Sequence, residues 1–165
     1  VSTKHITYCT SGMYCNALVT AGLSDAKVTV VGPFDISGTS ALVGAMKAYS
    51  VMTGEEISEK TMDTATDELV TTAEIAKNVG DTQKVTELVA AAKKAIFEDQ
   101  LSSETDIRDA IEQAANELGL DLSDDDVEKL TNMMMKVSKE DIDPDKIAKQ
   151  ASDIYNKLKE LVEDR

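Results

Sequence analysis

The sequence predicts an α+β protein, with an α/β segment at residues 1–54 followed by an all-helical segment at residues 55–165. Glycine marks the first segment, which holds six of the eight glycines and both cysteines. Charge marks the second: residues 1–54 have a net charge of +1 within a chain of −14, so residues 55–165 carry −15. Apolar residues alternate in parts of the first segment and recur at helical spacing throughout the second.

The first segment has the order strand, helix, strand, helix. Residues 4–8 alternate and include β-branched side chains, which predicts a strand. An apolar stripe from residue 11 predicts a helix that ends at Gly22. Residues 27–31 are β-branched and apolar and predict a buried strand that stops at Gly32-Pro33, and residues 38–52 predict the second helix, capped by Ser37 or Thr39.

The two strands are expected to be parallel if they are neighbours, because the connection between them contains a helix and such crossovers are right-handed. Two strands are too few for a stable sheet. The sequence therefore predicts that this segment belongs to a larger sheet whose other strands come from elsewhere.

The acidic segment predicts about five amphipathic helices, packed as a small bundle or against the sheet. Asp106 and Asp126 complete capping boxes at the starts of two of them, and Thr71-Thr72 is a possible break within the first. Each helix is expected to begin at a residue that favours an N-terminal cap: Ser58, Asp81, Ser103, Ser123 and Asp143, the last followed by Pro144.

Composition argues against several classes of function. A net charge of −14 disfavours binding to nucleic acid or to anionic membranes, because both need Lys and Arg to neutralise phosphate. No apolar run approaches the roughly 20 residues of a transmembrane helix. With one His and six aromatic residues, the chain has little material for His-based catalysis or for stacking on bases.

The cysteines allow two interpretations from spacing alone. Cys9 and Cys15 lie at a strand-to-helix corner, where a disulfide is reachable if their Cα atoms come within about 7 Å, and two buried thiols are the alternative. A zinc site is poorly supported, since His5 is the only imidazole. A nucleophile pair of Cys9 and His5 is disfavoured, because residues four apart on a strand stand roughly 13 Å apart.

Residues 37–40 form a weak candidate for anion binding. Ser37, Gly38, Thr39 and Ser40 precede or begin a helix whose free amides can hold an anion. Residues 38–41 resemble half of the G-x-S-x-G motif of serine hydrolases, but Leu42 stands where the second Gly is required. Helix capping is the simpler explanation of these residues.

A weak calcium candidate lies near the start of the last helix. Asp141, Asp143 and Asp145 match the first three spacings of a calcium loop. The pattern then fails, because Lys146 stands where Gly is required and Ser152 where Glu is required. No other metal or cofactor is expected.

Several stretches resemble the family known as domain of unknown function 1002. The resemblance covers nearly the whole chain and is most specific over residues 5–75. It is carried by residues 5–14 (HITYCTSGMY), 16–22 (NALVTAG), 26–30 (AKVTV), 33–44 (PFDISGTSALVG) and 68–75 (ELVTTAEI).

The resemblance implies an extracytoplasmic protein of Gram-positive bacteria, made with a signal peptide and secreted or associated with the cell envelope. Family members carry a longer, strand-rich N-terminal portion, so this chain is expected to be a C-terminal fragment of such a protein. An oxidising compartment favours a Cys9–Cys15 disulfide. The family has no assigned activity, so no catalytic residues can be transferred.

The preferred hypothesis is a non-enzymatic binding or assembly module that pairs with a protein partner, or with itself, through a sheet edge. One alternative is a cell-envelope hydrolase that uses Ser40 or acidic residues. The other is an acidic, calcium-dependent interaction module around residues 141–145.

Overall fold

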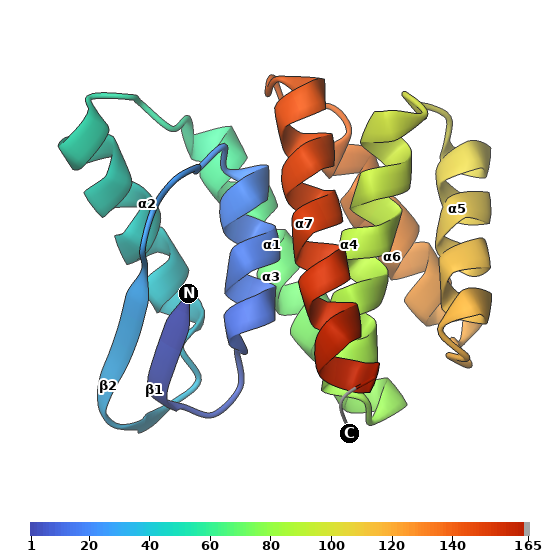
Figure 1. Ribbon diagram of the computed structural model, residues 1–165, viewed down its shortest axis with the longest axis horizontal. Coiled ribbons are helices and arrows are strands. Elements are labelled where there is room, and N and C mark those ends of the chain that lie inside the picture. Colours follow the sequence, from blue (N-terminus) through green and yellow to red (C-terminus); the bar gives the residue numbers. More distant parts are fainter. Residues whose placement is uncertain (164–165) are drawn as a thin grey trace.

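The computed structural model describes residues 1–163 and confirms the α+β class (Figure 1). Two strands and two helices alternate at the start, and five helices follow. The elements are β1 (Ser2–Ile6), α1 (Ser11–Thr20), β2 (Thr29–Ile36), α2 (Thr39–Thr53), α3 (Glu59–Val79), α4 (Thr82–Glu98), α5 (Glu104–Glu117), α6 (Asp124–Val137) and α7 (Pro144–Glu163).

The two strands form a parallel sheet, as predicted, with α1 as the crossover between them. Thr3 pairs with Val30 and Lys4 with Val31, and the register then shifts before Ile6 pairs with Ile36. The predicted stop at Gly32-Pro33 was wrong, because β2 continues through both residues to Ile36. An edge strand tolerates proline where its missing N–H would point away from the neighbouring strand.

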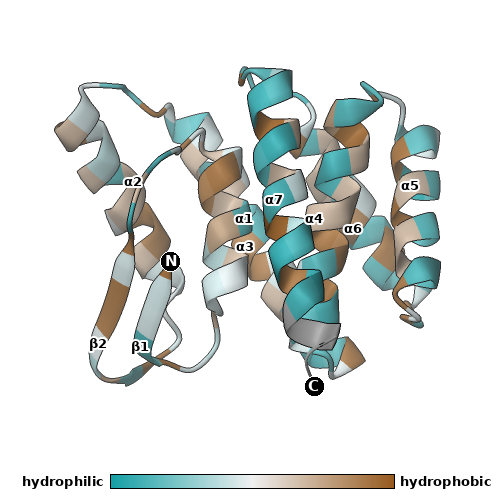
Figure 2. Cartoon of the chain, viewed as in Figure 1, coloured by the Kyte–Doolittle hydropathy of each residue, from teal (hydrophilic) through white to brown (hydrophobic). Residues whose placement is uncertain are grey.

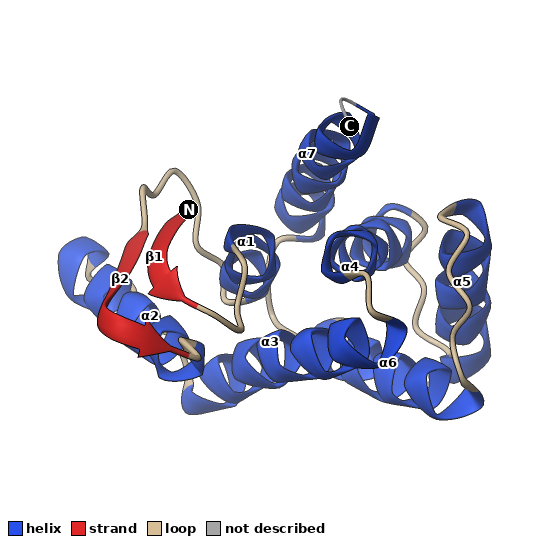
Figure 3. Cartoon of the chain, turned by 90° about the horizontal axis from the view of Figure 1, so that it is seen from below, coloured by secondary structure: helices blue, strands red, loops and turns tan. Residues whose placement is uncertain are grey.

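The helices pack around one hydrophobic core that joins both segments of the chain. Helix α1 contacts α3, α4 and α7, so the crossover helix is also part of the bundle. Figures 1 and 3 show an elongated molecule, with β1, β2 and α2 at one end and α5 at the other. The two strands and α2 of the near-neutral segment therefore lie at one end of the long axis, and α1 joins them to the acidic helices.

The caps predicted for the acidic helices are confirmed. The side chains of Ser58, Asp81, Ser103 and Ser123 each accept a hydrogen bond from the backbone N–H three residues later, and Asp143 accepts from the N–H groups of residues 145 and 146.

Two local expectations were wrong. Helix α3 runs through Thr71-Thr72 without a break, and the Thr72 hydroxyl donates to the carbonyl oxygen of Glu68 within the helix. Helix α2 is capped by Gly38, with no side-chain hydrogen bond from Ser37 or Thr39.

The capping box of α6 also ties α6 to α3. Ser123 donates to one oxygen of Asp126 at 2.7 Å, and Asn78 of α3 donates to the other at 3.1 Å. Burial acts to raise the pKa of Asp126, but these hydrogen bonds outweigh it and hold the pKa below its ordinary value.

Because the folded-state pKa of Asp126 is lowered, its contribution to stability is present above the unfolded pKa near 3.8 and is lost as pH falls through the folded value. We expect Asp126→Asn to lower the free energy of unfolding by about 1 kcal/mol at pH 7. The loss should shrink below about pH 4, which urea unfolding at several pH values measures. Asp106→Asn, in the exposed box of α5, is the matched control and should cost less; equal losses at pH 7 and pH 3 would contradict this account.

Candidate functional site

The outer edge of β2 has no neighbouring strand within the described residues. The carbonyl oxygen of Val28 accepts from Ser2 of β1 at 3.0 Å, so residue 28 directs its backbone groups toward β1. Backbone direction alternates along a strand, and therefore Thr29 and Val31 direct their N–H and C=O groups outward. These unpaired groups can accept an added strand.

A groove with a volume of about 780 Å³ runs along this edge. One wall is the stretch of residues 23–31, which includes the β2 edge, and the other is helix α2 (Figure 3). The wall from α2 consists mostly of small or apolar residues: Ala41, Gly44, Ala45, Ala48, Tyr49, Met52 and Thr53. Helix α2 thus covers space beside β2 that no strand of the described chain fills.

The exposed large hydrophobic side chains gather at the same end of the molecule. Within the described residues they all belong to residues 1–52, and the most exposed lie on β2 and at the end of α2: Val1, Val31, Phe34, Val51 and Met52. Figure 2 shows hydrophobic stretches on both β2 and α2. Met52 is 85% exposed and also lines the groove. An apolar surface beside an open sheet edge is typical of a protein-binding site.

Two of the residues predicted for anion binding, Ser37 and Gly38, accept hydrogen bonds through their carbonyl oxygens. Tyr14 donates its hydroxyl hydrogen bond to the carbonyl oxygen of Gly38, and the backbone N–H of Cys9 donates to that of Ser37 at 3.2 Å. Ser40 is exposed on the first turn of α2, outside the lining of the groove. The hydrogen bonds described here therefore give residues 37 and 38 a role in joining β1 and α1 to α2.

The predicted Cys9–Cys15 disulfide is not found, and both cysteines are free thiols. Cys9 is 2% exposed and lies in the core, where burial raises the pKa of its thiol although a hydrogen bond with Tyr14 acts to lower it. Cys15 is half-buried on the side of α1 that faces α7. The two side chains thus belong to different packing environments.

We expect the two thiols to differ in reactivity. In the native protein at neutral pH, iodoacetamide should label Cys15 and leave Cys9 unlabelled until the protein is unfolded, because Cys9 is buried and has a raised pKa. Mass spectrometry of tryptic peptides locates the label. If neither cysteine is labelled in the unfolded protein until a reductant is added, the free-thiol arrangement is contradicted.

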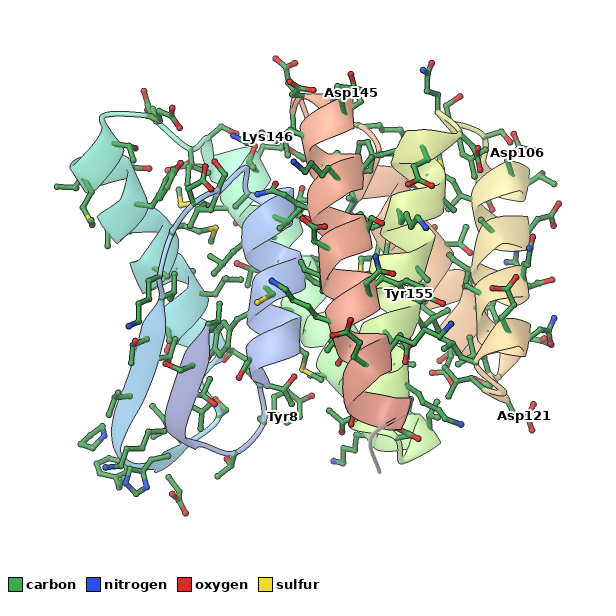
Figure 4. All side chains as sticks on the ribbon, in the orientation of Figure 1. Tyr8, Asp106, Asp121, Asp145, Lys146 and Tyr155 are labelled. Atoms are coloured by element: carbon green, nitrogen blue, oxygen red, sulfur yellow. The ribbon has the colours of Figure 1, made fainter. Side chains whose placement is uncertain are left out.

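The three aspartates of the calcium candidate lie around the start of α7, where Figure 4 labels Asp145. Asp143 is engaged as the cap, accepting from the backbone N–H groups of Asp145 and Lys146 at 3.0 and 3.3 Å. Among residues 1–163 there is no group of three or more His, Cys, Asp or Glu side chains arranged to hold a metal ion.

A buried polar cluster was missed by sequence reasoning. Lys93 of α4 is fully buried, and its ammonium lies 2.7 Å from Glu68 of α3 and 2.6 Å from the carbonyl oxygen of Asn16 in α1. Thr20 donates to the second oxygen of Glu68, and Asn16 donates to the carbonyl oxygen of Thr86 at 3.0 Å. Desolvation lowers the pKa of Lys93, although Glu68 beside it acts in the opposite direction.

This cluster is enclosed by three helices and holds α1, α3 and α4 together. A signal for it is present in the sequence, because Glu68 and Lys93 occupy positions on the apolar stripes of their helices. Glu68 lies beside Leu69 and three residues after Ala65, and Lys93 lies four residues after Val89. Charged residues at such positions are either buried with a partner or mark the edge of the stripe.

Comparison with known proteins places the chain in a family. The model for proteins of unknown function named DUF1002 matches residues 1–154. The chain belongs to this family. It is also 36% identical, over 164 residues, to the uncharacterised protein YpuA of Bacillus subtilis (strain 168). That alignment covers 99% of this chain but 56% of YpuA, so the chain spans little more than half of this relative.

No solved structure matches the chain. Of the helices in the described region, none combines the length and the apolar character that crossing a membrane requires.

Proposed function

We propose that this chain is a non-enzymatic assembly module of a secreted or cell-envelope protein and that it binds an extended protein segment at the β2 edge. The observation that carries the proposal is the unpaired backbone of Thr29 and Val31 beside the groove under α2. An added strand gains hydrogen bonds from these backbone groups, and its inward-facing side chains fill the apolar groove.

The pairing segment is the first part of β2. Pro33 has no N–H to donate, so a strand that pairs along the whole edge would lose a hydrogen bond there. Residues 27–31 have all their donors, and the same stretch lines the groove. The proposed site is therefore residues 27–31 together with the face of α2 that carries Ala41, Ala45 and Ala48.

Thr29→Pro tests this function, because it removes the N–H that faces outward and leaves the backbone hydrogen bonds to β1 in place. The side-chain hydrogen bond that Thr29 accepts from Ser2 at 3.3 Å is lost here and in an alanine variant alike. Thr29→Ala is the matched control, since it keeps the N–H. In cells that naturally make the protein, we expect chemical cross-linking to capture the Thr29→Ala chain in complexes larger than the monomer and to leave the Thr29→Pro chain mostly monomeric. If both chains are monomeric, or both assemble equally, the proposed site is wrong.

The same cells test the proposed location. Protease added to intact cells should digest the chain, or the chain should appear in the medium, if it lies outside the cytoplasmic membrane. A chain that is degraded only after lysis would contradict an extracytoplasmic location. It would not affect the cross-linking result, which tests strand binding separately.

A further inference from the structure

We infer that the segment bound at the β2 edge is β2 of a second copy of this chain, paired antiparallel about a two-fold axis at Thr29. The inference rests on the proposed function and names its partner. It is carried by three independent features: the self-complementary pattern of the edge, the small-residue face of α2, and the distribution of charge along the molecule.

Backbone chemistry selects the register. In an antiparallel pair centred on Thr29, the two Thr29 residues face each other and Lys27 faces Val31 of the second copy. Thr29 and Val31 direct their backbone groups outward, and both they and Lys27, two residues before β2, possess an N–H that can donate to the other copy. A pair centred on Val31 would instead place Pro33 opposite Thr29 and lose a donor in each copy.

Side chains on both faces of the pair are compatible with this register. On the inner face, Val28 of one copy lies opposite Val30 of the other, and both residues line the groove beside α2. On the outer face, the hydrocarbon stem of Lys27 can cover Val31, which is 58% exposed in the single chain. The two Lys27 ammonium groups do not face each other, so the register creates no direct like-charge pair.

Helix α2 provides room for the second copy. A Cβ built on Gly44 meets no atom within 4 Å, and Ala48 nearby is exposed. Two α2 helices brought together by the strand pairing can therefore approach closely along their small-residue faces. This contact also brings the exposed Met52 of each copy next to apolar surface of the other.

Charge favours an end-to-end arrangement. The α/β segment has a net charge of +1, whereas residues 55–165 carry −15. Because β2 and α2 lie at one end of the long axis, two copies joined there keep the acidic helices α4, α5 and α6 away from the contact, and of the acidic helices within the described residues only α3 packs against α2 (Figure 1). Joining the copies through the acidic helices would instead place two strongly negative surfaces in contact.

Sedimentation of the purified 165-residue chain across micromolar concentrations tests the inference. We expect a reversible monomer–dimer equilibrium whose dissociation constant is raised at least about tenfold by Thr29→Pro and changed little by Thr29→Ala. A chain that is monomeric at every concentration, or a dimer that Thr29→Pro leaves intact, overturns the inference.

A cross-link tests the register separately, in a chain that carries Cys15→Ser. Thr29→Cys should form a disulfide-linked dimer under mild oxidation, because the Cα atoms of a hydrogen-bonded antiparallel pair are about 5.5 Å apart. Phe34→Cys is the control: Phe34 is 69% exposed, so random collision favours it, yet the register keeps the two copies of residue 34 apart. Equal or faster cross-linking of Phe34→Cys overturns the inference.

The two proposals fail in different ways. If the purified chain is monomeric but Thr29→Pro still removes it from complexes in cells, the β2 edge binds a strand from another source. In that case strand binding at the edge stands, and the inference that a second copy supplies the strand is wrong. Such a strand can belong to a different protein or to the further polypeptide that longer relatives such as YpuA possess. If neither measurement responds to Thr29→Pro, both proposals are wrong.

Discussion

Replacing Lys93 with methionine should destabilise the protein by about 3–5 kcal/mol, because the substitution leaves the buried carboxylate of Glu68 without its cation. Typical domains are stable by about 5–15 kcal/mol, so a loss of this size is close to complete unfolding. Urea unfolding at pH 7, followed by circular dichroism, measures the change.

A double variant distinguishes the effect of leaving Glu68 without a cation from the effect of changing the size of the side chain at position 93. The double substitution Glu68→Gln with Lys93→Met should recover most of the lost stability, because a neutral amide can still accept from Thr20 and no buried charge remains. Lys94→Met is the matched control on the neighbouring position. Lys94 is partly exposed and makes a 4.0 Å ion pair with Glu98, so its loss should cost less than about 1 kcal/mol. A double variant as unstable as Lys93→Met would contradict the role assigned to the ion pair.

Replacing Gly38 with alanine should destabilise the protein by about 2–4 kcal/mol. Gly38 has a φ of +89°, in the left-handed region, and its carbonyl oxygen accepts from Tyr14. An added Cβ would overlap the Tyr14 hydroxyl and the side chain of Ile6, so both α1 and β1 would have to move. The effect should appear first in the α/β segment, as faster amide exchange in β1 and β2.

Gly44→Ala provides the control for Gly38→Ala because it changes the same residue type, inside the helix that Gly38 caps. Gly44 lies inside α2, and a Cβ there meets open space. Alanine should therefore leave stability unchanged or raise it by up to about 1 kcal/mol. If Gly38→Ala and Gly44→Ala have the same effect, the close approach at Gly38 is not what requires glycine.

Most helices of residues 55–165 could be predicted because the capping residues that mark their starts act locally. A serine or aspartate that caps a helix acts on backbone groups three residues away, and so Ser58 and Ser123 identify helix starts without knowledge of the fold. The break expected at Thr71-Thr72 was wrong, because the low helix propensity of threonine is a weak preference that packing overrides. Thr72 is buried, and its hydroxyl bonds within the helix.

The sheet was harder to predict because its limits depend on tertiary surroundings. A proline ends a strand that has neighbours on both sides, because it cannot donate a hydrogen bond to one of them. Strand β2 has a free edge and therefore continues past Pro33. The partnership of Glu68 and Lys93 could not be predicted either. The two residues are 25 apart in sequence, and only the packing of α3 against α4 brings them together.

The sequence predicted that the sheet has an unpaired edge, but it did not predict the groove beside that edge. The shortage of strands indicated an unpaired edge, whereas the wall that α2 supplies follows from its position in three dimensions. The disulfide favoured by the family resemblance is absent, because the side chain of Cys9 packs in the hydrophobic core and that of Cys15 lies on the side of α1 that faces α7.

Amide hydrogen exchange at Thr29 and Val31 tests the central claim most directly, because it reports on the open edge itself. In the dilute monomer these two amides should exchange rapidly, while Val30, whose backbone faces β1, is protected. In the assembled protein Thr29 and Val31 should become protected as well. If both amides remain unprotected when the protein is assembled, or are already protected in the monomer, β2 does not bind an added strand.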